Sequence, residues 1–190
     1  MSVNLVKGQK INLSKEVSGL TKVMVGLGWD AVKKGFFGSK PDIDCDASAI
    51  ILGKDGEYRT CVYYGDRSAE SKCVYHHGDN LTGGGNGDDE QITVDLANIT
   101  DKVEKIVFVV NIYNCVARKQ DFGLVKNAYI RLVNESTGKE ICKYNLSDDY
   151  AGKTAMVFAE VYKKDGEWKF NAIGQGTNDS SISELIKRYK

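Results

Sequence analysis

The sequence predicts an all-β protein, a two-sheet antiparallel β-sandwich with a short C-terminal helix. Most apolar segments are short and rich in Val, Ile, Tyr and Phe, which favour strands. Gly, Asn and Asp separate these segments, as turn residues separate strands. Only the end of the chain shows a clear helical spacing of apolar residues. The 190 residues fit a single domain, residues 1–190, which is long enough to bury a hydrophobic core.

The candidate strands are runs of β-branched and aromatic residues that end at turn residues. Residues 106–110 are apolar at every position, which predicts a strand in the middle of a sheet. In chain order the candidates are residues 23–29, 47–52, 59–64, 91–95, 105–113, 126–134, 139–145, 155–163 and 167–173.

Two turns share a hexapeptide pattern, at residues 54–59 and 164–169. In each of them an Asp-Gly pair supplies the positive φ angles that a two-residue hairpin needs. The repetition has two interpretations. It is either a trace of two related halves that face each other as a sandwich, or the independent use of a favoured hairpin turn.

A helix is predicted at the C-terminus, where Ser181 and Glu184 have the spacing of a capping box. Apolar residues recur at helical spacing after the cap: Ile182, Leu185, Ile186 and Tyr189. We expect this apolar stripe to pack on the sandwich. A partner-binding role for the stripe is the weaker interpretation, because such stripes ordinarily belong to a core.

The charge balance argues against partners that are recognised by net charge. The chain has 26 basic and 26 acidic residues, so no net field attracts it to nucleic acid or to an anionic membrane. The first residues lack the apolar run of a signal peptide, and the longest apolar stretch is too short to cross a bilayer. We therefore expect a cytoplasmic protein with no nucleic-acid partner and no direct membrane insertion.

The five cysteines are odd in number and contain no Cys-x-x-Cys motif. This pattern suggests neither a disulfide framework nor a zinc ribbon. We expect most of the cysteines to be small core residues. Cys45 lies between two aspartates, which predicts a raised thiol pKa and low reactivity.

Two acidic segments predict a cation site. Residues 78–90 contain four acids, five glycines and no base. Carboxylates, side-chain amides and backbone carbonyls are the oxygen ligands of Ca²⁺, and glycine lets the chain turn its carbonyls inward. Upstream, Asp42, Asp44 and Asp46 alternate along the chain, so in an extended conformation they share one face. Solvation of two ordinary acidic loops is the alternative interpretation.

Common cation and catalytic motifs do not fit this chain. With Asp42 at position 1 of an EF-hand, Ala47 would replace the required glycine and Gly53 the bidentate glutamate. Residues 84–89 match the core of the calcium β-roll repeat only once, and a solenoid needs repeats. The sequence contains no Gly-x-Ser-x-Gly and no His-Glu-x-x-His. Neither acidic segment is therefore explained by a known motif of its own, and the two have to be interpreted together.

A family resemblance rests on the same residues. Residues 44–49, Asp-Cys-Asp-Ala-Ser-Ala, resemble the Asp-x-Asp-Ala-Ser-Ala element of the TerD (tellurite resistance) family, and residues 78–90 resemble its Gly-Asp-Asn-x-Thr-Gly and Gly-Asp-Asp-Glu element. The similarity spans nearly the whole chain. It implies a β-sandwich and a bacterial cytosolic stress protein that binds Ca²⁺ through these acidic segments. It also implies other tellurite-resistance proteins as candidate partners.

Carried over position by position, the resemblance implies ligands in both segments. Two ions of Ca²⁺ are expected. Asp42 is added from the alternating pattern, and Gly84 from the glycine-rich loop, although Gly84 and Asn86 stand where the family often has acids. The candidate metal ligands are Asp42, Asp44, Asp46, Asp79, Asn80, Gly84, Asp88, Asp89 and Glu90.

We expect a protein that is not an enzyme, because the chain offers few groups for catalysis. His76 and His77 are the only histidines, and adjacent residues of a strand point to opposite faces. We expect them at the surface or in contact with metal ligands. The alternatives are a metal-dependent hydrolase or phosphotransferase, and a calcium-dependent lectin-like module. An aromatic side chain at the surface beside the ions would favour the lectin-like module, whereas we expect these aromatics mostly in the core: Trp29, Tyr63, Tyr64, Trp168 and Phe170.

Overall fold

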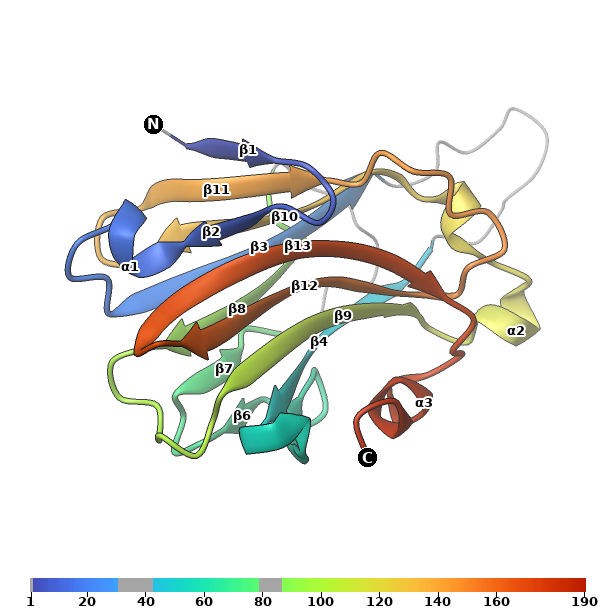
Figure 1. The fold of residues 1–190 in the computed structure, drawn as a ribbon. Helices are drawn as coiled ribbons and strands as arrows, with labels where there is room; N and C mark the ends of the chain where they lie inside the picture. Colours follow the sequence, from blue (N-terminus) through green and yellow to red (C-terminus); the bar gives the residue numbers. More distant parts are fainter. Residues whose placement is uncertain (1, 31–42, 79–86) are drawn as a thin grey trace.

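The computed structural model describes residues 2–30, 43–78 and 87–190 of the chain. Its strands form two sheets that pack face to face as a β-sandwich (Figure 1), which confirms the predicted fold class. We call the seven-stranded sheet, with the order β1-β11-β10-β3-β8-β7-β6, sheet A. The six-stranded sheet, with the order β2-β13-β12-β9-β4-β5, is sheet B.

In sheet A all neighbouring strands are antiparallel except β1, which runs parallel to β11. The strands of sheet A are β1 (Val3–Leu5), β3 (Lys22–Asp30), β6 (Ser68–Ala69), β7 (Val74–His76), β8 (Glu90–Asp95), β10 (Lys126–Asn134) and β11 (Lys139–Asn145).

Sheet B is antiparallel throughout, and its strand β9 lies between β4 and β12. The interior position of β9 explains why residues 106–110 are apolar at every position, since both faces of this strand are covered. The strands of sheet B are β2 (Lys10–Asn12), β4 (Cys45–Leu52), β5 (Tyr58–Val62), β9 (Lys105–Ile112), β12 (Ala155–Lys164) and β13 (Glu167–Thr177).

Both predicted Asp-Gly hairpins are present. Asp55 and Gly56 have φ angles of 64° and 78° between β4 and β5, and Asp165 and Gly166 have 56° and 76° between β12 and β13. The two hairpins belong to the same sheet, one on either side of β9. The interpretation in which the two turns belong to halves that face each other is therefore wrong.

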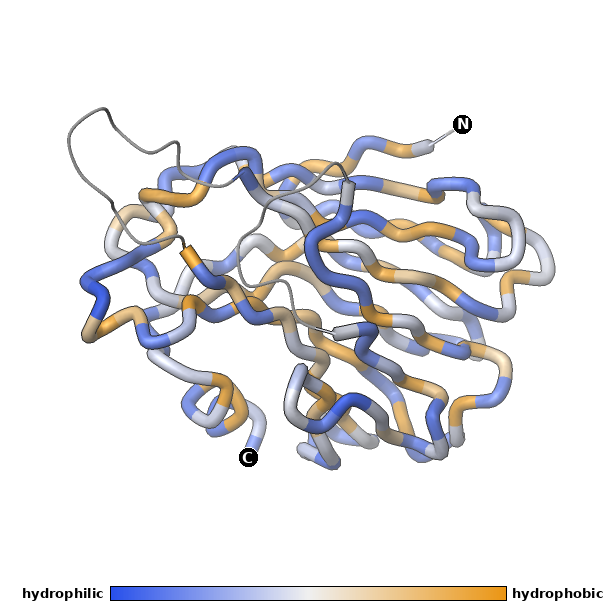
Figure 2. Tube along the Cα trace, turned by 180° about the vertical axis from the view of Figure 1, so that it is seen from behind, coloured by the Kyte–Doolittle hydropathy of each residue, from blue (hydrophilic) through white to orange (hydrophobic). Residues whose placement is uncertain are grey.

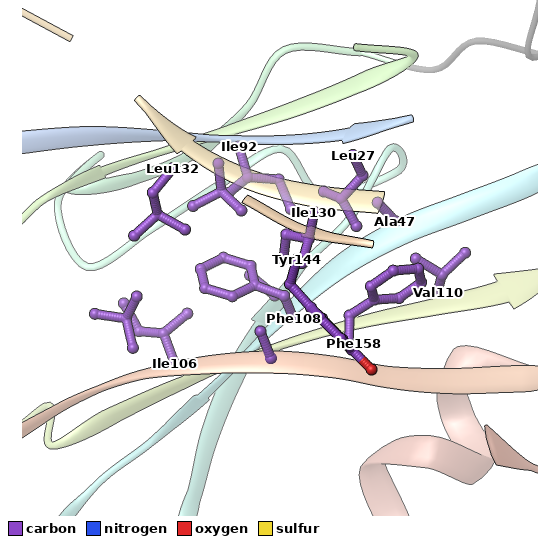
Figure 3. Close-up of a cluster of buried hydrophobic side chains, with 14 of the residues drawn as sticks. Leu27, Ala47, Ile92, Ile106, Phe108, Val110, Ile130, Leu132, Tyr144 and Phe158 are labelled. Atoms are coloured by element: carbon purple, nitrogen blue, oxygen red, sulfur yellow. The ribbon is translucent and has the colours of Figure 1, made fainter. Parts of the chain in front are cut away.

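The main core fills the space between the sheets. Figure 3 shows Phe108 and Phe158 of sheet B meeting Ile130 and Leu132 of sheet A, and all four side chains are buried. Figure 2 shows hydrophobic and hydrophilic positions alternating along the strands, as the two faces of a half-buried strand require.

A second apolar cluster covers the outer face of sheet B. The predicted C-terminal helix, α3 (Ile182–Lys187), buries Leu185 against Ile50, Val107 and Val157 of that sheet. In Figure 1 this helix lies beside sheet B at the C-terminal end of the chain. The helix therefore packs on the sandwich, as we expected from its stripe.

Several short elements have no counterpart among the sequence predictions. They are the strands β1, β2, β6 and β7, the helices α1 (Leu13–Glu16) and α2 (Cys115–Arg118), and the 3-10 turn η2 (Phe122–Leu124), while the 3-10 turn η1 (Lys54–Gly56) falls within the predicted turn at residues 54–59. Strand β4 also begins two residues before the predicted start, so it includes Asp46. Within the described part of the chain, no helix is long and apolar enough to cross a membrane.

Candidate functional site

The candidate site lies where strand β4 loses one of its neighbours. Strand β4 pairs with β9 from Cys45 onward, whereas within the described residues β5 pairs only with Ala49 and the residues after it. The backbone groups at the start of β4 that point away from β9 therefore need other partners.

Two side chains from sheet A bond these groups. Oε2 of Glu90 accepts a hydrogen bond from the N–H of Ala47 at 2.8 Å. Nε2 of His76 lies 3.2 Å from the carbonyl oxygen of Ala47 and 3.2 Å from Oε2 of Glu90. The N–H of Gly78 donates to Nδ1 of His76, which places the ring proton of neutral His76 on Nε2. Both side chains are almost fully buried.

The side chains of β4 alternate as the sequence predicts. Cys45 and Ala47 belong to the main core, while Asp46 and Ser48 line a pocket on the other face of sheet B. The carboxylate of Asp46 accepts a hydrogen bond from the side-chain amide of Asn111, with 3.4 Å between Nδ2 and Oδ2.

Asp44 stands just before β4 and is 8% exposed. Its Oδ2 is 3.6 Å from Nη1 of Arg118, a residue of α2. The guanidinium group of Arg118 therefore offsets part of the negative charge of Asp44.

Asp88 and Asp89 have different surroundings although they are neighbours. Oδ2 of Asp89 accepts a hydrogen bond from the N–H of Trp29 at 2.8 Å. Burial raises the pKa of Asp89, the bond from Trp29 opposes this rise, and the charges of Asp88 and Asp30 add to it. The charged form of Asp89 is therefore disfavoured, and a nearby cation would stabilise it.

The carboxylate of Asp88 is held by sheet A. Its Oδ1 accepts from Nε of Arg131 at 2.7 Å and its Oδ2 from Nη2 at 3.0 Å, and the hydroxyl of Tyr129 lies 3.0 Å from Oδ1. The Asp88 side chain is fully buried over Gly26 of β3. These contacts give Asp88 a structural role at the start of β8.

Four of the five described acids from the two segments lie near the thiol of Cys45. Burial raises the pKa of the Cys45 thiol well above its ordinary value, and the charges of four carboxylates raise it further. In order of their effect, these carboxylates belong to Asp46, Asp44, Glu90 and Asp89. The direction of this shift agrees with the one predicted from the sequence.

The structure describes five of the nine candidate ligands: Asp44, Asp46, Asp88, Asp89 and Glu90. Among the residues that the structure describes, no group of three or more His, Cys, Asp and Glu side chains is arranged to hold a metal ion. The donor chemistry fits Ca²⁺, which takes carboxylate oxygens. The other four candidates lie outside the described residues: Asp42, Asp79, Asn80 and Gly84.

Sequence reasoning missed His76, Arg118 and Arg131 as specific partners of the acids. For His76 the expectation of a surface position is wrong, because its side chain is 0% exposed. The alternative expectation, contact with a candidate metal ligand, fits its position beside Glu90. No local sequence pattern marks these contacts, because each joins residues from different strands or loops.

The predicted core aromatics divide into two groups. Trp29, Trp168 and Phe170 are buried in the main core, as expected. Tyr64 is 42% exposed, so the expectation of a core position is wrong for this residue. Tyr63 is partly buried against the outer cluster of sheet B, and both tyrosines line the same pocket as Asp46.

The chain is similar to known proteins in sequence and in fold. The model of the TerD domain family matches residues 1–189. The chain is 50% identical to stress response protein SCP2 of Bacillus subtilis (strain 168) over 198 aligned residues, which cover 100% of both chains. It is 44% identical over 179 residues to tellurium resistance protein TerD of Serratia marcescens, with 93% of this chain and 91% of that protein covered.

A solved structure supports the fold. The crystal structure of a homologue of telluride resistance protein (TerD) from Streptomyces coelicolor A3(2) has a TM-score of 0.68 to this chain at 21% sequence identity. The match covers 87% of this chain and 95% of the other. At this identity the likeness concerns the sandwich itself.

Proposed function

Because this chain belongs to the TerD domain family, we propose that it is a stress-response protein of the tellurium-resistance type that binds Ca²⁺ between its two acidic segments. The names of the two relatives place them in stress response and tellurium resistance. The proposed location is the cytoplasm, which the family resemblance implies. Association with other tellurium-resistance proteins is a further expectation of that resemblance.

The concentration of carboxylates around Cys45 is the observation that carries the ion-binding proposal. Two carboxylates about 5 Å apart repel each other by about 3 kcal/mol at an effective dielectric constant of about 20. A divalent cation between the segments would replace this repulsion by attraction. The ion would also join residues that are more than 40 positions apart in the sequence, such as Asp46 and Asp89.

The five described acids have different roles in this proposal. Asp44, Asp46 and Asp89 supply carboxylate oxygens to the ion, together with ligands outside the described residues. Glu90 fixes the edge of β4 through the N–H of Ala47. Asp88 fixes the start of β8 through Arg131. Bound Ca²⁺ would neutralise the charge of the two segments and hold them together.

Calorimetric titration with Ca²⁺, repeated with Mg²⁺, tests the proposal. We expect Ca²⁺ binding by the wild type and a loss of affinity of at least about tenfold in both Asp46→Asn and Asp89→Asn, because each variant removes one charged ligand. Asp101→Asn is the matched control, since the side chain of Asp101 is 92% exposed and pairs with Lys163. Absence of binding by the wild type, or equal affinity in all three variants, contradicts the site.

Two further measurements connect the ion to the function. Ca²⁺ at about 100 times its dissociation constant should add about 2.7 kcal/mol to the free energy of unfolding. Cells that depend on this protein for growth on tellurite should lose that growth with Asp46→Asn and keep it with Asp101→Asn. Turnover of phosphate esters that disappears in Asp46→Asn would instead support a metal-dependent hydrolase or phosphotransferase.

A further inference from the structure

A pocket of about 340 Å³ opens on the outer face of sheet B, beside the start of α3. Its volume is within the range of small-molecule sites, which is about 300 to 1,000 Å³. Side chains of β4, β9 and the segment after β5 meet the N-terminal end of α3 there. The residues that line it include Asp46, Ser48, Tyr63, Tyr64, Asn111 and Tyr113.

Two buried polar groups belong to this lining. Ser48 is 1% exposed and Asn111 is 5% exposed. Among the described residues, neither Oγ of Ser48 nor Oδ1 of Asn111 has a hydrogen-bond partner. Buried polar atoms are nearly always bonded, and an unbonded one costs about 1 to 3 kcal/mol. A ligand with a hydroxyl group would satisfy both, because a hydroxyl donates to Oδ1 of Asn111 and accepts from the hydroxyl of Ser48.

The rim of the pocket is aromatic. Tyr64 and Tyr113 are 42% and 45% exposed, and Tyr63 packs edge-to-face on Tyr64. The face of an aromatic ring carries partial negative charge and attracts the positively polarised hydrogens of a sugar ring. The rim therefore offers apolar surface beside a floor that offers hydrogen bonds.

The described lining residues carry little charge. No Lys or Arg is among the described lining residues, and their one charged side chain is Asp46. Arg118 lies over the ring of Tyr113, 5.2 Å from its centroid, and pairs with Asp44 instead of lining the pocket. Unless Ca²⁺ is bound at Asp46, a phosphate or carboxylate ligand would find a like charge and no Lys or Arg among these described lining residues.

We propose that this pocket binds a neutral pyranose sugar, with one face of the sugar on Tyr64 and its hydroxyls on Ser48 and Asn111. An organic cation is the competing ligand, because carboxylates and tyrosine rings also attract ammonium groups. The sugar fits better, since an ammonium group only donates hydrogen bonds and leaves the hydroxyl proton of Ser48 without an acceptor, whereas a sugar hydroxyl both donates and accepts.

Titration of ¹⁵N-labelled protein with methyl glycosides, followed by NMR, tests this proposal. The probes are the methyl α- and β-pyranosides of glucose, galactose, mannose and N-acetylglucosamine, with choline as the cationic competitor. At least one glycoside should shift the amide signals of Asn111 and Ser181. Ser48→Ala should weaken that binding without loss of folding, because it removes a hydroxyl with no partner among the described residues. Tyr64→Ala should weaken it by about tenfold or more, through the lost ring.

Tyr75→Ala is the matched control, because Tyr75 is 36% exposed on β7 of the other sheet. It should bind the glycoside as the wild type does. Three results would overturn the proposal. They are no shift with any glycoside, shifts with choline alone, and binding of the glycoside by Tyr64→Ala and Ser48→Ala with the affinity of the wild type. Asp46 belongs to both the pocket and the proposed ion site, so each titration is made with Ca²⁺ and again with EDTA. Glycoside binding in either condition supports the pocket even if Ca²⁺ does not bind.

Discussion

The carboxylate of Glu90 and the backbone of Ala47 join the two sheets of the sandwich at one edge. Oε2 of Glu90 accepts a hydrogen bond from the N–H of Ala47 at 2.8 Å, across 43 positions of sequence. The same oxygen lies 3.2 Å from Nε2 of His76, which in turn reaches the carbonyl of Ala47. A side chain that sequence patterns suggest as a metal ligand therefore also holds the fold together.

Glu90→Ala should lower the free energy of unfolding by about 2 to 3 kcal/mol, because it leaves the N–H of Ala47 buried without its acceptor. Glu90→Gln keeps an acceptor oxygen and should cost about 1 kcal/mol. Urea denaturation followed by circular dichroism measures both values. Glu57→Ala, at an exposed position, should stay within about 0.5 kcal/mol of the wild type. Equal effects at positions 57 and 90 would contradict the structural role of Glu90.

Gly26→Ala should destabilise the protein by about 1 to 3 kcal/mol through a clash with Asp88. A Cβ atom at Gly26 would overlap Oδ2 of Asp88, a carboxylate that Arg131 holds in place. Thermal denaturation of a double-mutant cycle with Asp88→Ala checks this explanation. The cost of Gly26→Ala should shrink when Asp88→Ala is present, because the clashing group is gone. An unchanged cost would mean that the glycine is needed for another reason.

Cys45 should resist alkylation in the folded protein. Its thiol is buried, and burial together with the charges of Asp46, Asp44, Glu90 and Asp89 raises its pKa, so little reactive thiolate is present at pH 8. Iodoacetamide treatment followed by peptide mass spectrometry should find Cys45 unmodified without denaturant and modified in urea.

Cys73 provides an internal comparison for that experiment, because it has the largest exposed fraction of the cysteines, 8%. It should therefore react before Cys45. Modification of both cysteines at the same rate in the folded protein would show that the surroundings of Cys45 are more open than the structure indicates.

The packing of α3 should weaken in acid through Glu184. The hydrogen bonds from the N–H and the hydroxyl of Ser180 lower the pKa of Glu184 below its ordinary value of 4.5. The folded state thus favours the charged form, so this stabilisation is present above pH 4.5 and is lost as the pH falls through the lowered pKa. The thermal midpoint of Glu184→Gln should consequently depend less on pH between about 5 and 3 than that of the wild type.

Glu16→Gln is the control for this pH dependence, because Glu16 is exposed and belongs to α1, which contacts β13 and β2. It should keep the wild-type pH profile. If Glu184→Gln also keeps that profile, the bonds from Ser180 do not contribute to the acid sensitivity of the protein.

Local sequence signals predicted the elements that depend on neighbouring residues. The turn at Asp165 and Gly166 has the positive φ angles that its residue types favour. The hydroxyl of Ser181 accepts from the N–H of Glu184, as an N-cap does. The carboxylate of Glu184, however, bonds Ser180 instead of Ser181, so the capping box is displaced by one residue.

Local sequence signals did not predict the contacts between residues that are far apart in the sequence. Strands β1 and β2 have three residues each, which is too short for a periodic pattern. Strand β4 begins at Cys45 because Asp46 pairs with Asn111 of β9, and an acid is a poor strand signal in a sequence. The place of His76 depends on Glu90 and Ala47, which only the tertiary structure brings to it.

The incomplete pairing of β4 also bears on self-association. A strand edge with unsatisfied N–H and C=O groups is a template on which another chain can add a strand, and repeated addition leads to aggregates. Glu90 and His76 occupy the N–H and the carbonyl of Ala47 at such an edge. These two buried side chains therefore act against aggregation, by denying a second molecule the backbone groups with which it could extend the sheet.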